Sequence, residues 1–301
     1  MSVIAEKSVL NLKAVIFATD FSLCSQNAGL YAARMAAYFS AKLLIAHAFT
    51  LSQAALEVEI GDRKVSQQRD DLKRLLSKEA LLLGMYSVEP VPILLEGDPK
   101  DAITELADRN KPSMIVLGTH GGGRLERGII GSVAEKILRS SSWPALTVGP
   151  KVKPVSSKTL PLKRILFATD FTPAAASAAT YAVILAETFG AKIDVVNVIH
   201  EDAMLNPDRL SDLRSRFFSA LDGLVPQQAK EFSDPDTYVA AGNAHDQIIE
   251  HIRERSIDLL VFGIRKASHL SMKMRTSGAF RIIVDAECPV LTIRRSETDR
   301  C

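Results

Sequence analysis

A glycine-rich stretch from Gly118 to Ser132 carries the residue types that could bind an anion. Six of its fifteen residues are glycine, and it follows an apolar run that ends at Leu117. Gly131 and Ser132 stand directly before an apolar segment with helical spacing, whose free N–H groups and dipole would point back at the stretch. Glycines after a strand, exposed N–H groups and a hydroxyl favour a phosphate cradle over a plain flexible loop.

Two common phosphate-binding loops do not fit this stretch. A Walker A loop closes with Gly-Lys-Ser or Gly-Lys-Thr, which is not found here. A dinucleotide fingerprint follows the first strand of its sheet, whereas this stretch follows the fourth expected strand. The segment "ATDFS", which ends the first expected strand, lacks the glycine-rich serine motif of pyrophosphatase-type ATP enzymes.

The sequence predicts neither a catalytic residue nor a metal site. His120 lies in the glycine-rich stretch, but no Ser or Cys nucleophile and no acidic orienting residue can be assigned to it. His47 lies in an expected strand, where we expect it to be packed. The three cysteines show no metal-ligand spacing, and an odd, sparse set of thiols fits a reducing compartment.

The elements that must position these residues are expected to alternate between strand and helix. Apolar runs predict strands at 13–19, 42–49, 88–95, 113–117 and 144–148, and helical spacing predicts helices at 25–39, 63–83, from Asp98-Pro99 onward and at 132–139. This alternation implies a parallel sheet with helices on both faces. Ligands in such sheets sit beyond the carboxyl ends of the strands, so Asp20 and Gly118 face one edge.

The chain contains this pattern twice. "LKAVIFATDFS" from Leu12 and "LKRILFATDFT" from Leu162 are identical at seven of eleven positions. We therefore expect two domains, 1–150 and 151–301, joined by a linker at 149–162 that is rich in Pro, Ser and Lys.

The chain resembles a tandem universal stress protein over essentially its whole length. ATP-binding members of that family share a motif of Gly, two residues, Gly, nine residues and Gly-Ser or Gly-Thr, which reads here as Gly118, Gly121 and Gly131-Ser132. The strand ends "ATDFS" and "IAHAF" also match. The resemblance implies two Rossmann-like α/β domains, each a five-stranded parallel sheet with helices on both faces. It also implies ATP or a related adenine nucleotide, with or without magnesium, at the strand ends. The resemblance further suggests that the last strands, "WPALTV" and "CPVLTI", pair edge to edge and so cover two exposed sheet edges.

The resemblance further implies which residues contact the nucleotide. These are Ala18, Thr19, Asp20, Ala48, Gly118, Gly121, Gly131, Ser132 and Val133. Asp20 would contact the nucleoside and the backbone at Ala48 the adenine. The first two glycines would admit the backbone to ribose and phosphates, and the last three residues would hold phosphate through N–H groups and the Ser132 hydroxyl. Arg124 and Arg127 could add charge to the outer phosphates, although loop arginines are more often solvated.

The second copy departs from the motif. Asp170 and Gly263 are kept, but Lys266 and Thr276 stand where the second and third glycines would be, and Ser277 follows. A lysine and a β-branched residue add side chains where close backbone approach was needed. The basic residues of this segment could bind another anion, but we favour a copy that is retained for structure.

Composition and charge narrow the function. Apolar residues make up 47% and the formal net charge is +2, which is typical of a globular protein and gives no case for nucleic acid or membrane partners. No apolar run approaches the about 20 residues of a membrane helix, and the N-terminus does not resemble a secretory signal. We expect a cytoplasmic, ATP-binding stress-response regulator or scaffold, with an unidentified regulatory protein partner and a homodimer as a further possibility. The alternatives are a slow ATPase or nucleotide-transfer enzyme, and an interaction module whose second copy binds the partner.

Overall fold

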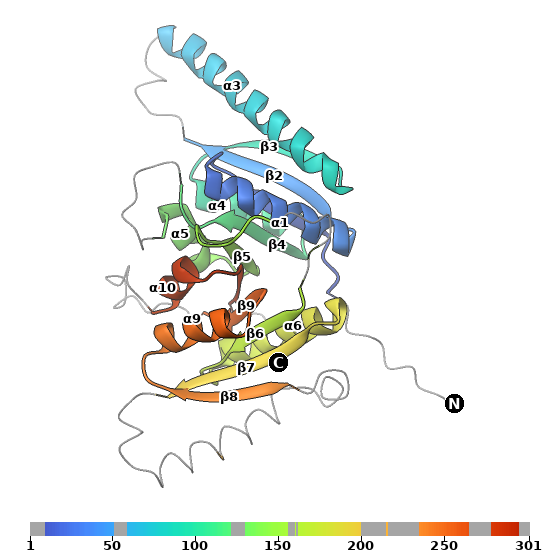
Figure 1. Cartoon of the computed structure of the whole chain (residues 1–301). Coiled ribbons are helices and arrows are strands. Elements are labelled where there is room, and N and C mark those ends of the chain that lie inside the picture. The colour runs from blue at the N-terminus through green and yellow to red at the C-terminus, as the bar shows by residue number, and fades with distance from the viewer. Residues whose placement is uncertain are drawn as a thin grey trace.

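The computed structural model describes residues 10–50, 59–121, 130–155, 160, 162–199, 215, 235–264 and 278–294. Side chains of the helix that begins at residue 59 are described from Val65 onward. Figure 1 shows two sets of strands and helices that meet along a shared sheet.

The first half contains the predicted alternation of strand and helix. Its elements are β1 (Ala14–Ala18), α1 (Leu23–Phe39), β2 (Lys42–Phe49), α3 (Glu59–Leu83), the 3-10 helix η1 (Gly84–Tyr86), β3 (Pro90–Glu96), α4 (Pro99–Arg109), β4 (Ser113–Gly118), α5 (Ser132–Ser140) and β5 (Ala145–Val148). Helix α1 begins two residues before the predicted 25, because the Ser22 hydroxyl caps it by accepting from the N–H of Ser25. Helix α3 begins four residues before the predicted 63.

The second half follows the same order. Its described elements are β6 (Arg164–Ala168), α6 (Pro173–Phe189), β7 (Lys192–Ile199), β8 (Asp236–Ala241), α9 (Ala244–Glu254), β9 (Leu259–Gly263), α10 (Gly278–Asp285) and β10 (Val290–Ile293). Thr172 caps α6 as Ser22 caps α1, and Asn243 caps α9 where Asp98 caps α4. The repeat in the sequence is therefore a repeat of structure, including the residues that start the helices.

All the strands belong to one ten-stranded sheet, in the order β3-β2-β1-β4-β5-β10-β9-β6-β7-β8. The strands are parallel within each half, and the halves join where β5 and β10 pair antiparallel. The predicted pairing of the two last strands is confirmed. The Thr147 hydroxyl donates to the carbonyl of Val290 and the Thr292 hydroxyl to that of Ala145, both at 3.1 Å. These bonds fasten a seam that leaves neither strand as an open edge.

The helices cover both faces of this sheet, as predicted. Helices α1, α3 and α6 pack on one face, and α4, α5, α9 and α10 pack on the other. On β1, Val15 and Phe17 enter the first core and Ala14 and Ile16 the second, because successive side chains of a strand point to opposite faces. Each core includes residues of both halves, so the two halves share continuous apolar layers.

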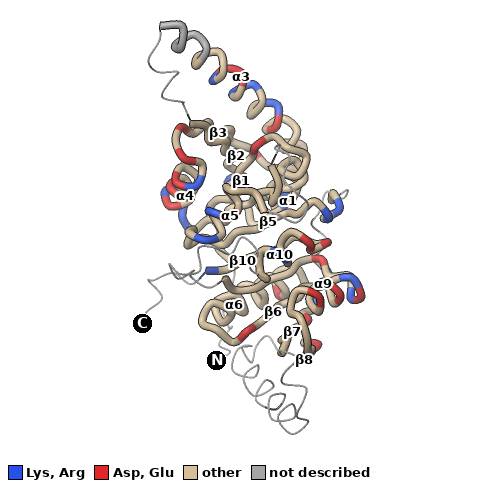
Figure 2. Tube along the Cα trace, turned by 90° about the vertical axis from the view of Figure 1, so that its left-hand side faces the viewer, with Lys and Arg blue, Asp and Glu red and all other residues tan. Residues whose placement is uncertain are grey.

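Acidic and basic residues are interspersed along the exposed helices of the described chain. Figure 2 shows both signs on α3, α4 and α9. Some form ion pairs, such as Arg69 with Glu96 at 2.6 Å and Lys136 with Asp98 at 3.0 Å. Exposed pairs of this kind contribute only about 0–1 kcal/mol each, so the two buried cores dominate the stability of the fold.

Candidate functional site

The carboxyl ends of β1, β2 and β4 and the start of α5 enclose a cavity of about 470 Å³. It lies where parallel sheets place their ligands, beyond the carboxyl ends of the strands. Its lining residues are Ala18, Thr19, Asp20, Ser25, His47, Ala48, Pro99, Ile103, Leu117, Gly118, Thr119, Gly121, Ile130, Gly131, Ser132, Val133 and Glu135. The nine residues named from the family motif all belong to this set.

Eight of the lining residues are not predicted by the sequence. They are Ser25, His47, Pro99, Ile103, Leu117, Thr119, Ile130 and Glu135. Pro99 and Ile103 come from the start of α4, which the Asp98-Pro99 pair marks in the sequence. Because α4 follows β3 in a parallel sheet, its first turn must reach the same edge as Asp20, and this topology could have identified both residues.

The turn after β1 holds Asp20 at the cavity through local hydrogen bonds. The Thr19 hydroxyl accepts from the N–H of Phe21 at 3.0 Å and lies 2.9 Å from the Ser25 hydroxyl. The Asp20 carboxylate accepts from the N–H of Ser22 at 3.1 Å. Phe21 adopts a left-handed φ of 63°, which is strained for a bulky residue and persists only where the surroundings impose it.

His47 helps to impose the left-handed conformation of Phe21. The sequence predicts only that His47 is packed and does not predict this contact. Its Nδ1 lies 2.8 Å from the carbonyl oxygen of Thr19, and its ring centroid lies 4.6 Å from that of Phe21. A carbonyl oxygen can only accept, so Nδ1 carries the proton in this contact. In the second half, Asn197 makes the same bond, from its Nδ2 to the carbonyl of Thr169 at 2.7 Å.

Glycine is required at the motif positions for different physical reasons. A Cβ at Gly118 would lie 3.0 Å from the backbone of Cys24 and Ser25, so this glycine allows β4 to approach the start of α1. A Cβ at Gly121 would lie 2.6 Å from the Asp20 carboxylate. Gly118 also lines the cavity, so its predicted role in admitting the backbone to a ligand stays a prediction, and helix packing is a further reason for glycine there. Gly263, which corresponds to Gly118 in the second half, has even less space, because a Cβ there would lie 2.3 Å from the backbone of α6.

Helix α5 presents its N-terminus to the cavity. Gly131 is the N-cap and has no side chain to satisfy the first N–H groups, which lack partners within an α-helix. The N–H of Gly131 itself donates to the carbonyl of Thr119 at 2.7 Å. A Cβ at Gly131 would lie 3.2 Å from that oxygen, so a larger residue would disturb the turn. The first N–H groups of α5 are therefore available for an anion.

His120 lies beside the cavity, and no carboxylate of the described residues orients it as a general base would require. Its Nδ1 contacts the hydroxyl of Thr119 at 2.9 Å, and its carbonyl accepts from the Ser22 hydroxyl. Burial lowers the pKa of His120 below its ordinary value, so the neutral form is favoured at neutral pH. Arg124 and Arg127 lie outside the described residues.

At five described positions, the matching edge of the second half carries less polar or larger residues. Ser25, Thr119 and Glu135 correspond there to Ala175, Ile264 and Phe280, and Ala48 and Leu117 correspond to the larger Val198 and Phe262. These replacements remove hydroxyl and carboxylate groups from the positions that line the first cavity. Lys266, Thr276 and Ser277 lie outside the described residues.

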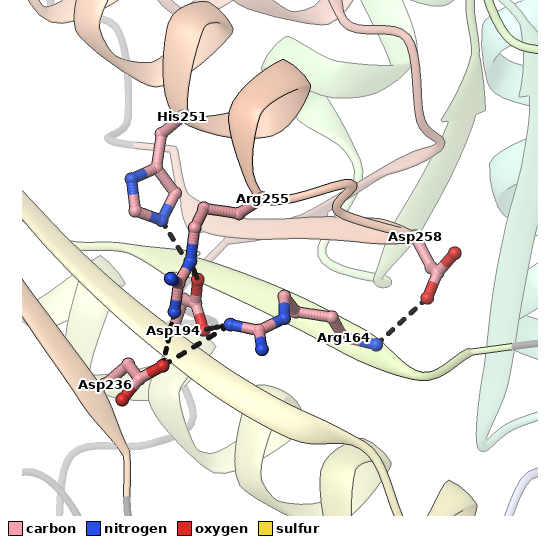
Figure 3. A network of polar contacts seen from close by, with 6 residues as sticks. All are labelled: Arg164, Asp194, Asp236, His251, Arg255 and Asp258. Carbon is pink, nitrogen blue, oxygen red and sulfur yellow. Dashed lines mark hydrogen bonds and ion pairs between the residues drawn. The ribbon is translucent and has the colours of Figure 1, made fainter.

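A second polar cluster lies away from the cavity, near the amino ends of β6 and β8 (Figure 3). Asp194 is fully buried there; Arg164 Nη1 lies 2.7 Å from Oδ1, and His251 Nε2 lies 3.0 Å from Oδ2. Arg255 pairs with both Asp194 and Asp236. Burial alone would raise the pKa of Asp194, but the hydrogen bond with His251 and the two arginines lower it below its ordinary value.

The first half has apolar residues at four positions of this cluster. Arg164, Asp194, Asp236 and His251 correspond to Ala14, Leu44, Val91 and Leu106, whereas Arg255 corresponds to the polar Asn110. The second half therefore has an ionic network around the buried Asp194 where the first half is mostly apolar. Both carboxylate oxygens of Asp194 have partners, and we assign the network to structure.

The described residues contain neither a cluster of metal-ligating side chains nor a helix suited to a membrane. No three His, Cys, Asp or Glu side chains among them gather as a metal site would require. Within the same residues, no helix combines the length and the apolar character that crossing a membrane demands.

The sequence is similar to those of universal stress proteins. The model of the universal stress protein family matches residues 11–149 and again residues 161–294. The universal stress protein MJ0531 of Methanocaldococcus jannaschii is 30% identical over 138 residues, which cover 45% of this chain and 81% of that protein. Stress response protein NhaX of Bacillus subtilis is 34% identical over 79 residues, which cover 26% of this chain and 48% of that protein.

A solved structure extends the likeness to both halves. The crystal structure of a universal stress protein from Archaeoglobus fulgidus has a TM-score of 0.72 and 19% identity, with 94% of this chain and 99% of that chain covered. At this identity the likeness shows the fold alone. The family match is made twice and spans most of the residues, and the chain therefore belongs to the universal stress protein family.

Proposed function

We propose that the first half binds ATP or a related adenine nucleotide, one per chain, and that the protein acts as a nucleotide-dependent regulator or scaffold in a stress response. The observation that carries the proposal is the cavity itself. It combines an apolar pocket, a carboxylate and the N-terminus of α5 at one edge of the sheet. A volume of about 470 Å³ falls within the range of small-molecule sites.

The two ends of the cavity suit the two ends of a nucleotide. Its apolar lining, which would take the base, consists of Ala18, Ala48, Pro99, Ile103, Leu117 and Val133. Asp20 offers a carboxylate that can accept from hydroxyl or amino groups of a nucleoside. At the other end, the N–H groups and the hydroxyl of Ser132 would hold phosphate through charge-assisted hydrogen bonds.

Among the described residues near the phosphate end, Glu135 already has an ionic partner. Glu135 lines the cavity, but its carboxylate pairs with Arg139 at 2.9 Å. The described residues offer no cluster of carboxylates that would hold magnesium by itself. A magnesium ion at this site would therefore enter with the phosphates, and we propose no protein ligand for it.

We divide the chain at residue 150 and give the nucleotide to the first domain, 1–150. The second domain, 151–301, has less polar or larger residues at described positions of the matching edge, for example Phe262 in place of Leu117, which supports this assignment. It would serve as a structural partner or as the half that binds a regulatory protein. The proposal includes a cytoplasmic setting, which the sparse set of three cysteines favours.

The mass of the nucleotide that co-purifies with the protein, followed by phosphate release in ATP and magnesium, tests the proposal. Persistent binding with little release is expected of a regulator, because no base or nucleophile can be assigned among the described cavity residues. Many turnovers per minute that disappear in Asp20→Asn would instead support the slow ATPase. Absence of any adenine nucleotide affinity would contradict both functions.

A further inference from the structure

Helix α3 carries one acidic residue in the face that it buries against the sheet. Leu76 and Leu83 of that face are buried in the first core, and Glu79 lies between them at helical spacing, only 8% exposed. An apolar residue would continue the face, and a buried carboxyl group is costly unless it is paired. One of its oxygens, Oε2, has no hydrogen-bond partner among the described residues. Packing alone therefore does not explain Glu79.

The contact that Glu79 makes leads to the cavity. Its carboxyl group lies close enough to the hydroxyl of Thr19 for that hydroxyl to lower the pKa of Glu79 as a hydrogen-bonding partner does. That hydroxyl also accepts from the N–H of Phe21 and contacts Ser25, so it sits at the centre of the turn that carries Asp20. Thr19, Asp20 and Ser25 line the cavity, whereas Glu79 does not and supports the turn from behind.

We propose that Glu79 is a positioning residue for the nucleotide site, whose carboxyl group holds Thr19 and thereby sets the position of Asp20. The proposal rests on the proposed function, because it assigns Glu79 a role in binding at the same cavity. Without this contact, the Thr19 hydroxyl would keep Phe21 and Ser25 as partners but would lose its link to α3. The strained backbone at Phe21 would then lose part of the network that imposes it.

Glu79 is suited to this role in its neutral form. Burial raises the pKa of the Glu79 carboxyl above its ordinary value; the hydrogen bond with Thr19 opposes the shift and the charge of Asp20 adds to it. An ionised Glu79 would place a second negative charge behind Asp20 and would need water that the core does not admit. Binding should therefore weaken as the pH rises through the raised pKa of Glu79.

Other charged groups near α3 are engaged elsewhere. Arg34 of α1 donates to the carbonyls of Leu30 and Val155, and Glu96 of β3 pairs with Arg69. His47 of β2 is bonded to the Thr19 carbonyl. Asp20 is thus the charge among the described residues that acts on Glu79.

Calorimetry with ATP on the full chain, together with melting temperatures, tests the proposal through three variants. Glu79→Leu continues the apolar face, so its melting temperature should hold or rise, while ATP affinity falls by about tenfold, as for one lost hydrogen bond. Leu83→Met, on the same face, is the control and should leave affinity unchanged. A Glu79→Leu protein that binds ATP as tightly as the wild type would overturn the proposal.

Glu79→Gln gives a second test that does not depend on how Glu79→Leu folds. It keeps an oxygen that can accept from Thr19 but cannot ionise. Its ATP affinity should match that of the wild type at acidic pH and should lack the wild-type decline as the pH rises. Phosphate and His120 titrate in both proteins, so the difference between the profiles isolates Glu79. Identical profiles would overturn the role of Glu79 alone, whereas a wild type without ATP affinity would overturn the proposed function.

Discussion

Removal of the Ser132 hydroxyl should weaken ATP binding without weakening the protein. Ser132 is the first residue of α5, and its neighbour Gly131 is the N-cap, so the Ser132 side chain does not cap the helix. Alanine at this position should therefore fold as well as serine, since alanine is the better helix former. The hydroxyl would donate a charge-assisted hydrogen bond to phosphate, which contributes about 1.5–3 kcal/mol. The loss corresponds to roughly ten- to a hundred-fold in affinity.

Calorimetry of Ser132→Ala with ATP and with adenosine measures this effect directly. Adenosine has no phosphate, so its affinity should change little, and the melting temperature of the free protein should stay within about a degree or two of the wild type. The ratio of the two affinity losses is the decisive quantity. Equal losses for ATP and adenosine would show that Ser132 shapes the cavity and does not contact phosphate, and would refute the reasoning.

Three further predictions follow from the glycines and the buried network. Gly121→Ala should displace the Asp20 carboxylate, 2.6 Å from the new Cβ, and weaken ATP and adenosine alike in calorimetry, with little change in melting temperature. Gly263→Ala should instead lower the melting temperature, because its Cβ would meet helix backbone at 2.3 Å. Asp194→Leu should cost about 1–3 kcal/mol in denaturant unfolding, because Arg164 and His251 lose the buried carboxylate, although Arg164 and Arg255 keep Asp236. Replacing Arg164, Asp194, Asp236 and His251 together by the apolar residues of the first half should cost less. The pKa of Asp194 is lowered in the folded protein, so its contribution to stability is present above the unfolded pKa and is lost as the pH falls through the folded pKa. Thermal melts at acidic pH should therefore show a loss of stability in the wild type that the variant with the apolar residues lacks.

The alternation of apolar runs and helical spacing was enough to predict the fold. Strands buried on both faces leave near-continuous apolar runs, and the caps at Ser22 and Asp98 mark where helices begin. The edge that carries the cavity then follows from the topology of parallel sheets. The pairing of β5 with β10 came from the family resemblance and not from local pattern, because the sequence alone does not say which edges meet.

Contacts between segments that lie far apart in the chain could not be predicted from the sequence. Nothing local to Gly118 shows that the backbone of α1 lies 3.0 Å from its Cβ position. Glu79 reads as one more exposed acid on a charged helix, and its burial depends on how α3 lies on the sheet. Arg164 and Asp194 are thirty residues apart, and each alone is an ordinary charged residue in a strand. In each case the residue type is explained by a contact with a residue that becomes a neighbour only when the chain folds.

The stoichiometry of nucleotide binding tests the central claim most directly. Native mass spectrometry or calorimetry of the intact chain with ATP should give one nucleotide per chain. Gly131→Thr imports the residue of the second half, and its Cβ would lie 3.2 Å from the Thr119 carbonyl at the start of α5. It should abolish binding while the protein stays folded. Two nucleotides per chain, or full binding by Gly131→Thr, would contradict the assignment of a single site to the first half.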